Sequence, residues 1–159
     1  MQQNTLWAQA SLPQLANALK SRMRQVVWRR LAPLGLSPQQ FQLLVAIAEQ
    51  DGRCHGDLAR RTWMDKPTTS RVLKTLQDRG LVRADADPGH GRRLRFHLQP
   101  AAEALMPDLE DVRRYMRVGM QRGLEAADLD RLRGILAVIM DNLDRMEAEL
   151  LAGERDTEA

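Results

Sequence analysis

The residues best suited to chemistry lie in one stretch, DKPTTSRVLKTLQDRGLV, which covers residues 65–82. It opens with an aspartate and a proline, which are typical of a helix N-terminus, and small hydroxyl residues follow. Residues with helical spacing mark the core face of the predicted helix: Thr69, Val72, Leu73 and Leu76. The side chains left on the outward face are small or cationic: Thr68, Ser70, Arg71 and Lys74.

This outward face has the chemistry of nucleic-acid recognition. Small side chains at a helix N-terminus let the backbone approach base edges, and the free N–H groups of the first turn attract phosphate. One turn further along the helix, Arg71 and Lys74 can reach guanine edges or the sugar-phosphate backbone. The stretch therefore predicts a helix that lies against a nucleic-acid duplex.

A second group of cations lies in RADADPGHGRRLRFHL, residues 83–98. Apolar and polar side chains alternate from Leu94 to Leu98, and an aspartate, a proline and two glycines precede them, so we expect a β-hairpin with its turn at residues 87–91. Arg92 and Arg93 follow the glycine-rich turn and suit insertion into a narrow minor groove.

Helices must position both groups. Hydrophobic periodicity predicts helices at residues 12–31, 38–49, 55–62, 100–122 and 126–151, and the fourth should bend or restart near Pro107. The last helix has apolar residues on more than one stripe, too many for a single contact within the chain. The expected fold class is mostly α with a small β-hairpin wing: a winged helix-turn-helix domain plus an α-helical dimerisation region.

The order of these elements resembles the MarR family of transcriptional regulators over nearly the whole chain. The segments that carry the resemblance are LSPQQFQLLVAIAE, DLARRTWMDKPTTSRVLKTLQDRGLVRADADP, GRRLRFHL and LEAADLDRLRGILAVIMDNL. The resemblance implies a homodimer in which the first, fifth and sixth helices intertwine, with two winged lobes on successive major grooves of a palindromic operator. It also implies a repressor that releases double-stranded DNA when a small aromatic or phenolic effector, or an oxidant, is bound or sensed.

By position, the resemblance makes Arg92 the arginine of the wing. The family often has an aspartate two residues earlier, where this chain has His90, so the wing is either held less firmly, titrates near neutral pH, or tolerates the change. The complete predicted DNA-binding set is Lys66, Thr68, Thr69, Ser70, Arg71, Lys74, His90, Arg92 and Arg93. No catalytic residue, metal site or cofactor is predicted.

The predicted organisation has four parts. Residues 1–36 form an N-terminal dimerisation helix, residues 37–99 the winged helix-turn-helix domain, residues 100–151 the C-terminal dimerisation helices, and residues 152–159 a flexible tail. Charge follows this division, because 16 of the 24 lysine and arginine residues but only seven of the 21 acidic residues lie in residues 1–99. A basic N-terminal part, residues 1–99, and an acidic C-terminal part favour a polyanionic partner.

The predicted effector site lies near the end of the first helix: Arg24, Gln25, Trp28 and Arg29. An aromatic ring beside an arginine suits a planar carboxylate, although Trp28 could instead pack in the core. Trp63 and Met64 are expected to be packing residues. Two alternatives to an effector-responsive regulator are a ligand-independent DNA-binding regulator and a redox sensor acting through Cys54, which is the single cysteine of the chain.

Composition limits the other function classes. A single cysteine excludes an intrachain disulfide and a cysteine-based zinc cluster. Neither a run of about 20 apolar residues nor a signal peptide is present, so we expect a cytoplasmic protein with no membrane partner. The chain contains no nucleophile-base-acid set or phosphate loop, which argues against an enzyme.

Overall fold

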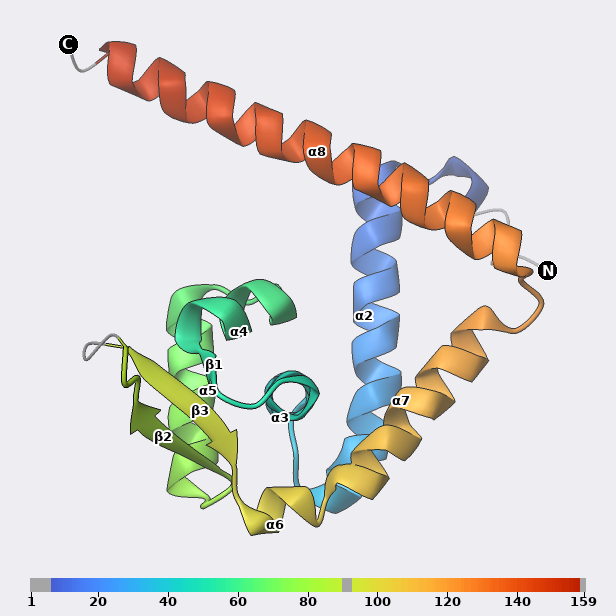
Figure 1. Ribbon diagram of the computed structural model, residues 1–159. Coiled ribbons are helices and arrows are strands. Elements are labelled where there is room, and N and C mark those ends of the chain that lie inside the picture. The colour runs from blue at the N-terminus through green and yellow to red at the C-terminus, as the bar shows by residue number, and fades with distance from the viewer. Residues whose placement is uncertain (1–6, 90–92, 158–159) are drawn as a thin grey trace. The chain divides into compact units, whose positions relative to one another are not determined.

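The computed structural model describes residues 7–89 and 93–157 (Figure 1). The helices of this part of the chain are α2 (Leu12–Leu31), the 3-10 helix η1 (Ala32–Leu34), α3 (Pro38–Glu49), α4 (His55–Thr62), α5 (Lys66–Asp78), α6 (Pro100–Glu103), α7 (Met106–Gln121) and α8 (Ala126–Thr157). The strands are β1 (Arg53–Cys54), β2 (Val82–Ala86) and β3 (Leu94–Leu98). No helix in the described ranges combines the length and apolarity that crossing a bilayer requires.

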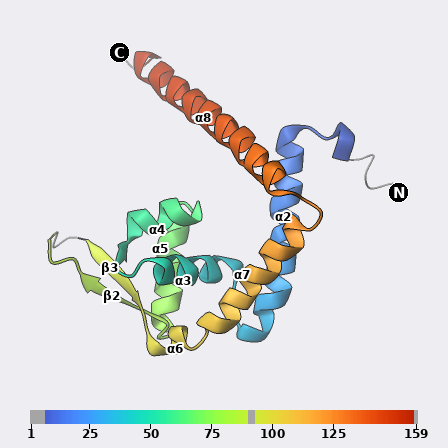
Figure 2. The same cartoon turned by 45° about the vertical axis from the view of Figure 1, so that its right-hand side comes forward.

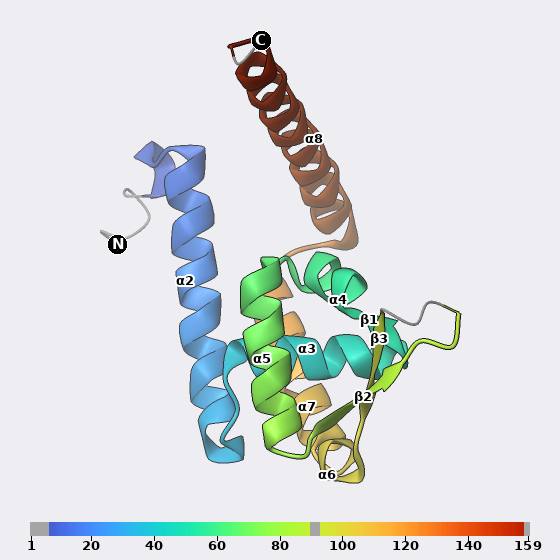
Figure 3. The same ribbon diagram turned by 90° about the vertical axis from the view of Figure 1, so that its left-hand side faces the viewer.

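The chain divides into two compact units, Met1–Met116 and Arg117–Ala159. The first unit is built around α3, which crosses its middle and packs against α2, α4, α5 and β3 (Figure 3). Its core consists of side chains that are completely removed from solvent: Leu31, Leu43, Leu44, Ile47, Leu58, Leu76 and Leu109. The second unit consists of the end of α7 and the single continuous helix α8.

Local capping explains why α3 begins where it does. The Ser37 hydroxyl accepts a hydrogen bond from the backbone N–H of Gln40 at 3.2 Å, and the Gln40 side chain accepts one from the backbone N–H of Ser37 at 2.8 Å. Pro38 occupies the first helical position, where no N–H is needed. These reciprocal bonds satisfy two N–H groups that would otherwise lack partners.

The three strands form an antiparallel sheet in the order β1-β3-β2. Ala84 of β2 pairs with Phe96 of β3, and Phe96 also pairs with Arg53 of β1. Phe96 is buried in the core, whereas Leu94, two residues earlier on the same strand, is half exposed. The β2–β3 hairpin therefore leaves the core and extends away from α2 (Figure 2).

The structure confirms the predicted helices at 12–31, 38–49 and 55–62, and the predicted restart near Pro107 appears as the break between α6 and α7. Strand β1 was not expected, because two residues carry no periodicity. The predicted end of the last helix at residue 151 was wrong, since α8 continues to Thr157. The added segment, AGERDT, includes an alanine, a glutamate and an arginine, which favour helix and offset the cost of Gly153.

Candidate nucleic-acid interface

The N-terminus of α5 is fixed by Asp65. One carboxylate oxygen accepts a hydrogen bond from the backbone N–H of Thr68 at 2.6 Å, and the other accepts one from the Thr68 hydroxyl at 3.0 Å. These bonds, the backbone one first, hold the pKa of Asp65 below its ordinary value. The Thr68 hydroxyl is therefore engaged in the cap, and the methyl group is the part of this side chain that remains for another contact.

Thr69 does not belong in the predicted DNA-binding set. Its side chain is completely buried, and its hydroxyl donates a hydrogen bond to the backbone carbonyl of Asp65 at 2.9 Å. The helical spacing had already placed Thr69 on the core face, beside Val72 and Leu73, and the structure confirms that placement. Including it among the DNA contacts was wrong, because it has no surface to offer a duplex.

The remaining predicted residues of α5 are exposed: Lys66, Ser70, Arg71 and Lys74. Ser70 Oγ lies 2.8 Å from His55 Nε2, which joins α5 to the beginning of α4. Lys74 Nζ lies 3.3 Å from an Asp78 carboxylate oxygen. Because this ion pair is exposed, it contributes little to stability. The Arg71 guanidinium forms no hydrogen bond or ion pair with any residue in the described ranges.

A groove of about 1210 Å³ lies between α4, α5 and β3. It brings together three residues that the sequence predicted to contact DNA, namely Lys66 and Ser70 of α5 and Arg93 beside β3. It also includes Trp63, which the sequence predicts to be a packing residue. That prediction is wrong, because the Trp63 side chain is 82% exposed. His90 and Arg92, also predicted to contact DNA, lie outside the described residues.

The turn end of the β2–β3 hairpin is fixed by a buried carboxylate, Asp87. One of its oxygens lies 3.2 Å from Arg95 Nε, and the other accepts a hydrogen bond from the backbone N–H of Gly89 at 3.0 Å. The Asp87 backbone N–H donates to the Arg93 carbonyl at 2.8 Å. Asp87 thus joins the two strands beside Arg93, and its role could not be identified from the sequence because turn aspartates are common at exposed sites too.

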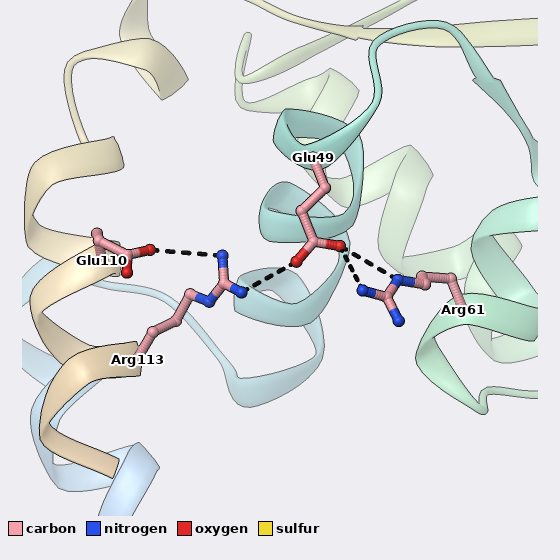
Figure 4. Close-up of polar contacts among 4 residues, drawn as sticks. All are labelled: Glu49, Arg61, Glu110 and Arg113. Carbon is pink, nitrogen blue, oxygen red and sulfur yellow. Dashed lines mark hydrogen bonds and ion pairs between the residues drawn. The ribbon is translucent and has the colours of Figure 1, made fainter. Parts of the chain in front are cut away.

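An ion-pair network joins α3, α4 and α7 (Figure 4). Glu49 accepts two hydrogen bonds from Arg61, at 2.8 and 3.1 Å, and one from Arg113 at 3.0 Å. Arg113 also lies 3.4 Å from Glu110. Burial alone would raise the pKa of Glu49, but the hydrogen bond from Arg61 and the charges of Arg61, Arg113 and Arg53 outweigh burial and lower it.

The thiol of Cys54 lies in the same groove and has an acidic neighbour. Its Sγ donates a hydrogen bond to an Asp57 carboxylate oxygen at 3.1 Å. This bond, together with the contact from Arg60, lowers the pKa of Asp57. Reactive cysteines are usually found beside cations, so this partner gives no support to a redox role. That role stays an untested alternative.

His97 is held more closely than the strand alternation indicated. The sequence placed it on the outward face of β3, but its Nδ1 lies 2.7 Å from an Asp51 oxygen and its Nε2 lies 3.7 Å from an Asp85 oxygen. Only 18% of the side chain is exposed. Within the described residues, no three histidine, cysteine or acidic side chains group as metal ligands do.

The predicted effector residues all lie on the exposed surface of α2: Arg24, Gln25, Trp28 and Arg29. Trp28 is 53% exposed, so the alternative that it packs in the core of this chain is wrong. None of the four lines the groove between α4, α5 and β3. The next residue, Arg30, stacks on the Tyr115 ring at 3.9 Å and joins α2 to α7.

Residues 34–93 match the sequence model of the MarR family. A solved MarR-family transcriptional regulator from Silicibacter pomeroyi is 27% identical, with a TM-score of 0.69 over 82% of this chain and 88% of that one. A probable transcriptional regulator from Pseudomonas aeruginosa is 29% identical, with a TM-score of 0.68 over 81% and 96%. The chain is thus similar to MarR-family transcriptional regulators, in sequence over residues 34–93 and in fold over most of its length.

The predicted winged helix-turn-helix fold is confirmed, and the matches are to transcriptional regulators rather than to enzymes, which supports a DNA-binding transcription regulator. A more distant match, 21% identical, is the Bordetella bronchiseptica protein BpsR, whose DNA binding is regulated by 6-hydroxynicotinic acid. BpsR has a TM-score of 0.73 over 82% of this chain and 94% of its own, which demonstrates a shared fold.

Proposed function

We propose that this regulator is a homodimeric repressor that binds a palindromic operator and releases it when a small aromatic carboxylate or phenolic effector binds. The observation that carries the proposal is the outward face of α5, where exposed Ser70 and Arg71 follow a capped N-terminus and Ser70 lines the same groove as Arg93. Cations and small polar groups in this arrangement suit a DNA duplex.

The proposed DNA contacts divide by groove. Lys66, Thr68, Ser70, Arg71 and Lys74 approach the major groove, and His90, Arg92 and Arg93 of the wing approach the adjacent minor groove or its phosphates. In the major groove, Arg71 is the residue most suited to reading a base, because its guanidinium forms no hydrogen bond or ion pair among the described residues and can donate two hydrogen bonds to guanine.

A second copy of the chain is the proposed partner of the apolar helix faces. Along one face of α8, exposed large apolar side chains recur at helical spacing: Leu132, Ile135, Leu136, Leu143, Met146 and Leu150. Leu12, Leu19, Met23 and Val26 of α2 are also exposed. So much apolar surface on a single chain indicates an interface, and a twofold dimer would carry two α5 helices to two half-sites.

The proposed effector is a planar aromatic acid or phenol. Trp28 offers a ring for stacking, and Arg24, one helical turn before it, offers a guanidinium for a carboxylate. The regulation of BpsR by a hydroxypyridine carboxylate is consistent with this chemistry. An effector that holds the two lobes at a spacing unsuited to successive major grooves would weaken DNA binding.

The test is a DNA-binding titration with duplexes from the region upstream of the protein's own gene, alone and with benzoate, hydroxycinnamate or pyridine carboxylates. We expect binding in the nanomolar range that at least one acid weakens, and by linkage that acid should also raise Tm. Trp28→Leu should lose the Tm shift, whereas Arg22→Ala on the same helix should keep it. If no acid changes DNA affinity or Tm, the ligand-independent regulator is favoured.

A further inference from the structure

The turn between α4 and α5 contains an unusual residue for its backbone conformation. Gly35, Gly52, Gly80 and Gly123 all have positive φ angles, between 63° and 80°. Among the residues that the structure describes, the only non-glycine residue with a positive φ is Trp63, at 55°. A bulky side chain disfavours this left-handed region, which is why glycine or asparagine usually ends a helix in this way.

Packing does not account for the tryptophan. Its backbone N–H donates to the carbonyls of Ala59 and Arg60, so the backbone of the turn is fixed by the end of α4. The side chain is 82% exposed, compared with 53% for Trp28 and 41% for Trp7. An indole that buries so little surface stabilises the fold very little, and it costs strain in the backbone.

The surroundings of the indole are those of a polyanion-binding surface. Trp63 lies two residues before the cap of α5 and lines the same groove as Arg60, Lys66, Ser70 and Arg93. Arg60 and Lys66 are exposed cations on either side of it in the sequence. A ring face packs well on a deoxyribose or a base, and the indole N–H is an uncharged hydrogen-bond donor.

We propose that Trp63 is a DNA-contact residue, with its ring against a deoxyribose and its indole N–H donating to a phosphate oxygen beside the major groove that α5 enters. This inference rests on the proposed DNA-binding mode of α5. The contact is uncharged, so it adds affinity without releasing a counterion from the DNA. It also explains why a strained and exposed tryptophan stands where glycine would fold more easily.

The test uses a 30-bp duplex selected by the wild-type protein from a randomised pool. Trp63→Asn removes the ring and the N–H but suits the left-handed backbone, so we expect Kd to rise at least fivefold while Tm stays equal or rises. Trp63→Phe keeps a ring and should give an intermediate Kd. For both variants the slope of log K against log salt should match that of the wild type, whereas Lys66→Ala should lower the slope by about one.

A second measurement observes the indole directly in the full-length protein. With 5-fluorotryptophan at every tryptophan, the fluorine resonance absent from Trp63→Phe is that of Trp63, and it should shift when the duplex is added. Trp7 provides an internal control, because its resonance should stay in place.

The outcomes separate this inference from the function on which it rests. Failure of the wild-type protein to bind any duplex would overturn both. Wild-type binding together with a Trp63→Asn Kd within twofold, or a Trp63 resonance unmoved at saturating DNA, would overturn only the Trp63 contact. A fall of several degrees in the Tm of Trp63→Asn would also overturn it, because the indole would then be a packing residue.

Discussion

Arg71 is the residue whose removal should change sequence recognition most. It is exposed on α5, six residues after the Asp65 cap, and it has no hydrogen-bond or ion-pair partner in the part of the chain that the structure describes. Arg71→Ala should weaken binding to the selected duplex by about 1–3 kcal/mol and relax the preference at one base pair. Binding titrations against duplexes that vary one position at a time measure both effects.

Lys66→Ala is the matched control for Arg71. Lys66 is an exposed cation at the first position of the same helix, where a phosphate contact is expected. The Lys66→Ala variant should bind all DNA sequences more weakly to the same extent, and its DNA affinity should depend less on salt, without a change in base preference. Equal loss of specificity in the two variants, or unchanged binding by Arg71→Ala, would contradict the role given to Arg71.

For single residues, the sequence correctly predicted which side chains of α5 are exposed. It did not predict which residues these side chains contact. The exposure of Ser70, Arg71 and Lys74 follows from helical periodicity, which is a local property. The partners of Ser70 and His97 are 15 and 46 residues away in the chain, so only the folded structure brings them together. Trp63 was misassigned because a large apolar residue in a short turn normally packs.

At the scale of the element, α5 depends on its cap. Asp65→Ala removes acceptors for the backbone N–H and hydroxyl of Thr68, so we expect Tm to fall by a few degrees and DNA affinity to fall with it. Asp65→Asn keeps an acceptor at the same place and should remain close to the wild type in Tm. Thermal melts of the three proteins check this, and an Asn variant as unstable as the Ala variant would count against capping.

Glu49 and Asp57 should make the free energy of unfolding depend on pH in the acid range. Glu49 and Asp57 both have lowered pKa values in the folded protein, so they bind fewer protons there than in the unfolded chain. Their stabilising contribution is therefore complete above the ordinary carboxyl values of 4.5 and 3.8, and it is lost as the pH falls through the lowered folded pKa values. Urea denaturation between pH 7 and pH 3 should show stability falling below about pH 4.5.

Glu49→Gln separates this network from the other carboxyls. The amide keeps the size of the side chain but cannot titrate, so the free energy of unfolding should depend less on pH below about 4.5 than in the wild type. An unchanged pH dependence would show that Glu49 is not among the groups responsible. Glu110→Gln is a useful comparison, since Glu110 lies 3.4 Å from Arg113 on the side of the guanidinium away from Glu49.

Elements were predictable wherever a local signal exists. Ser37-Pro38 and the capping Gln40 fixed the beginning of α3, and a proline predicted the break before α7. The two-residue strand β1 depends on pairing with β3, and the long reach of α8 depends on propensity beyond its apolar stripe. Neither signal is contained in hydrophobic periodicity.

At the scale of the whole molecule, dimerisation should depend on the apolar face of α8. Leu136→Glu places a charge among the exposed apolar residues. Because a twofold dimer contains this charge in both copies, the free energy of association should weaken by about 3–6 kcal/mol. The neighbouring Ala137→Glu puts the same charge on another side of the helix and should leave the dimer intact. Sedimentation equilibrium distinguishes the two, and a dimer that survives Leu136→Glu would exclude this face.

The central claim is that two copies of α5 lie together on one duplex. Hydroxyl-radical footprinting of the selected duplex, combined with the mass of the complex in solution, tests it most directly. We predict two chains per duplex and two protected segments whose centres are about 10 bp apart, both weakened in Arg71→Ala at concentrations that just saturate the wild type. One chain per duplex with a single protected segment, or no protection at moderate salt, would contradict the account.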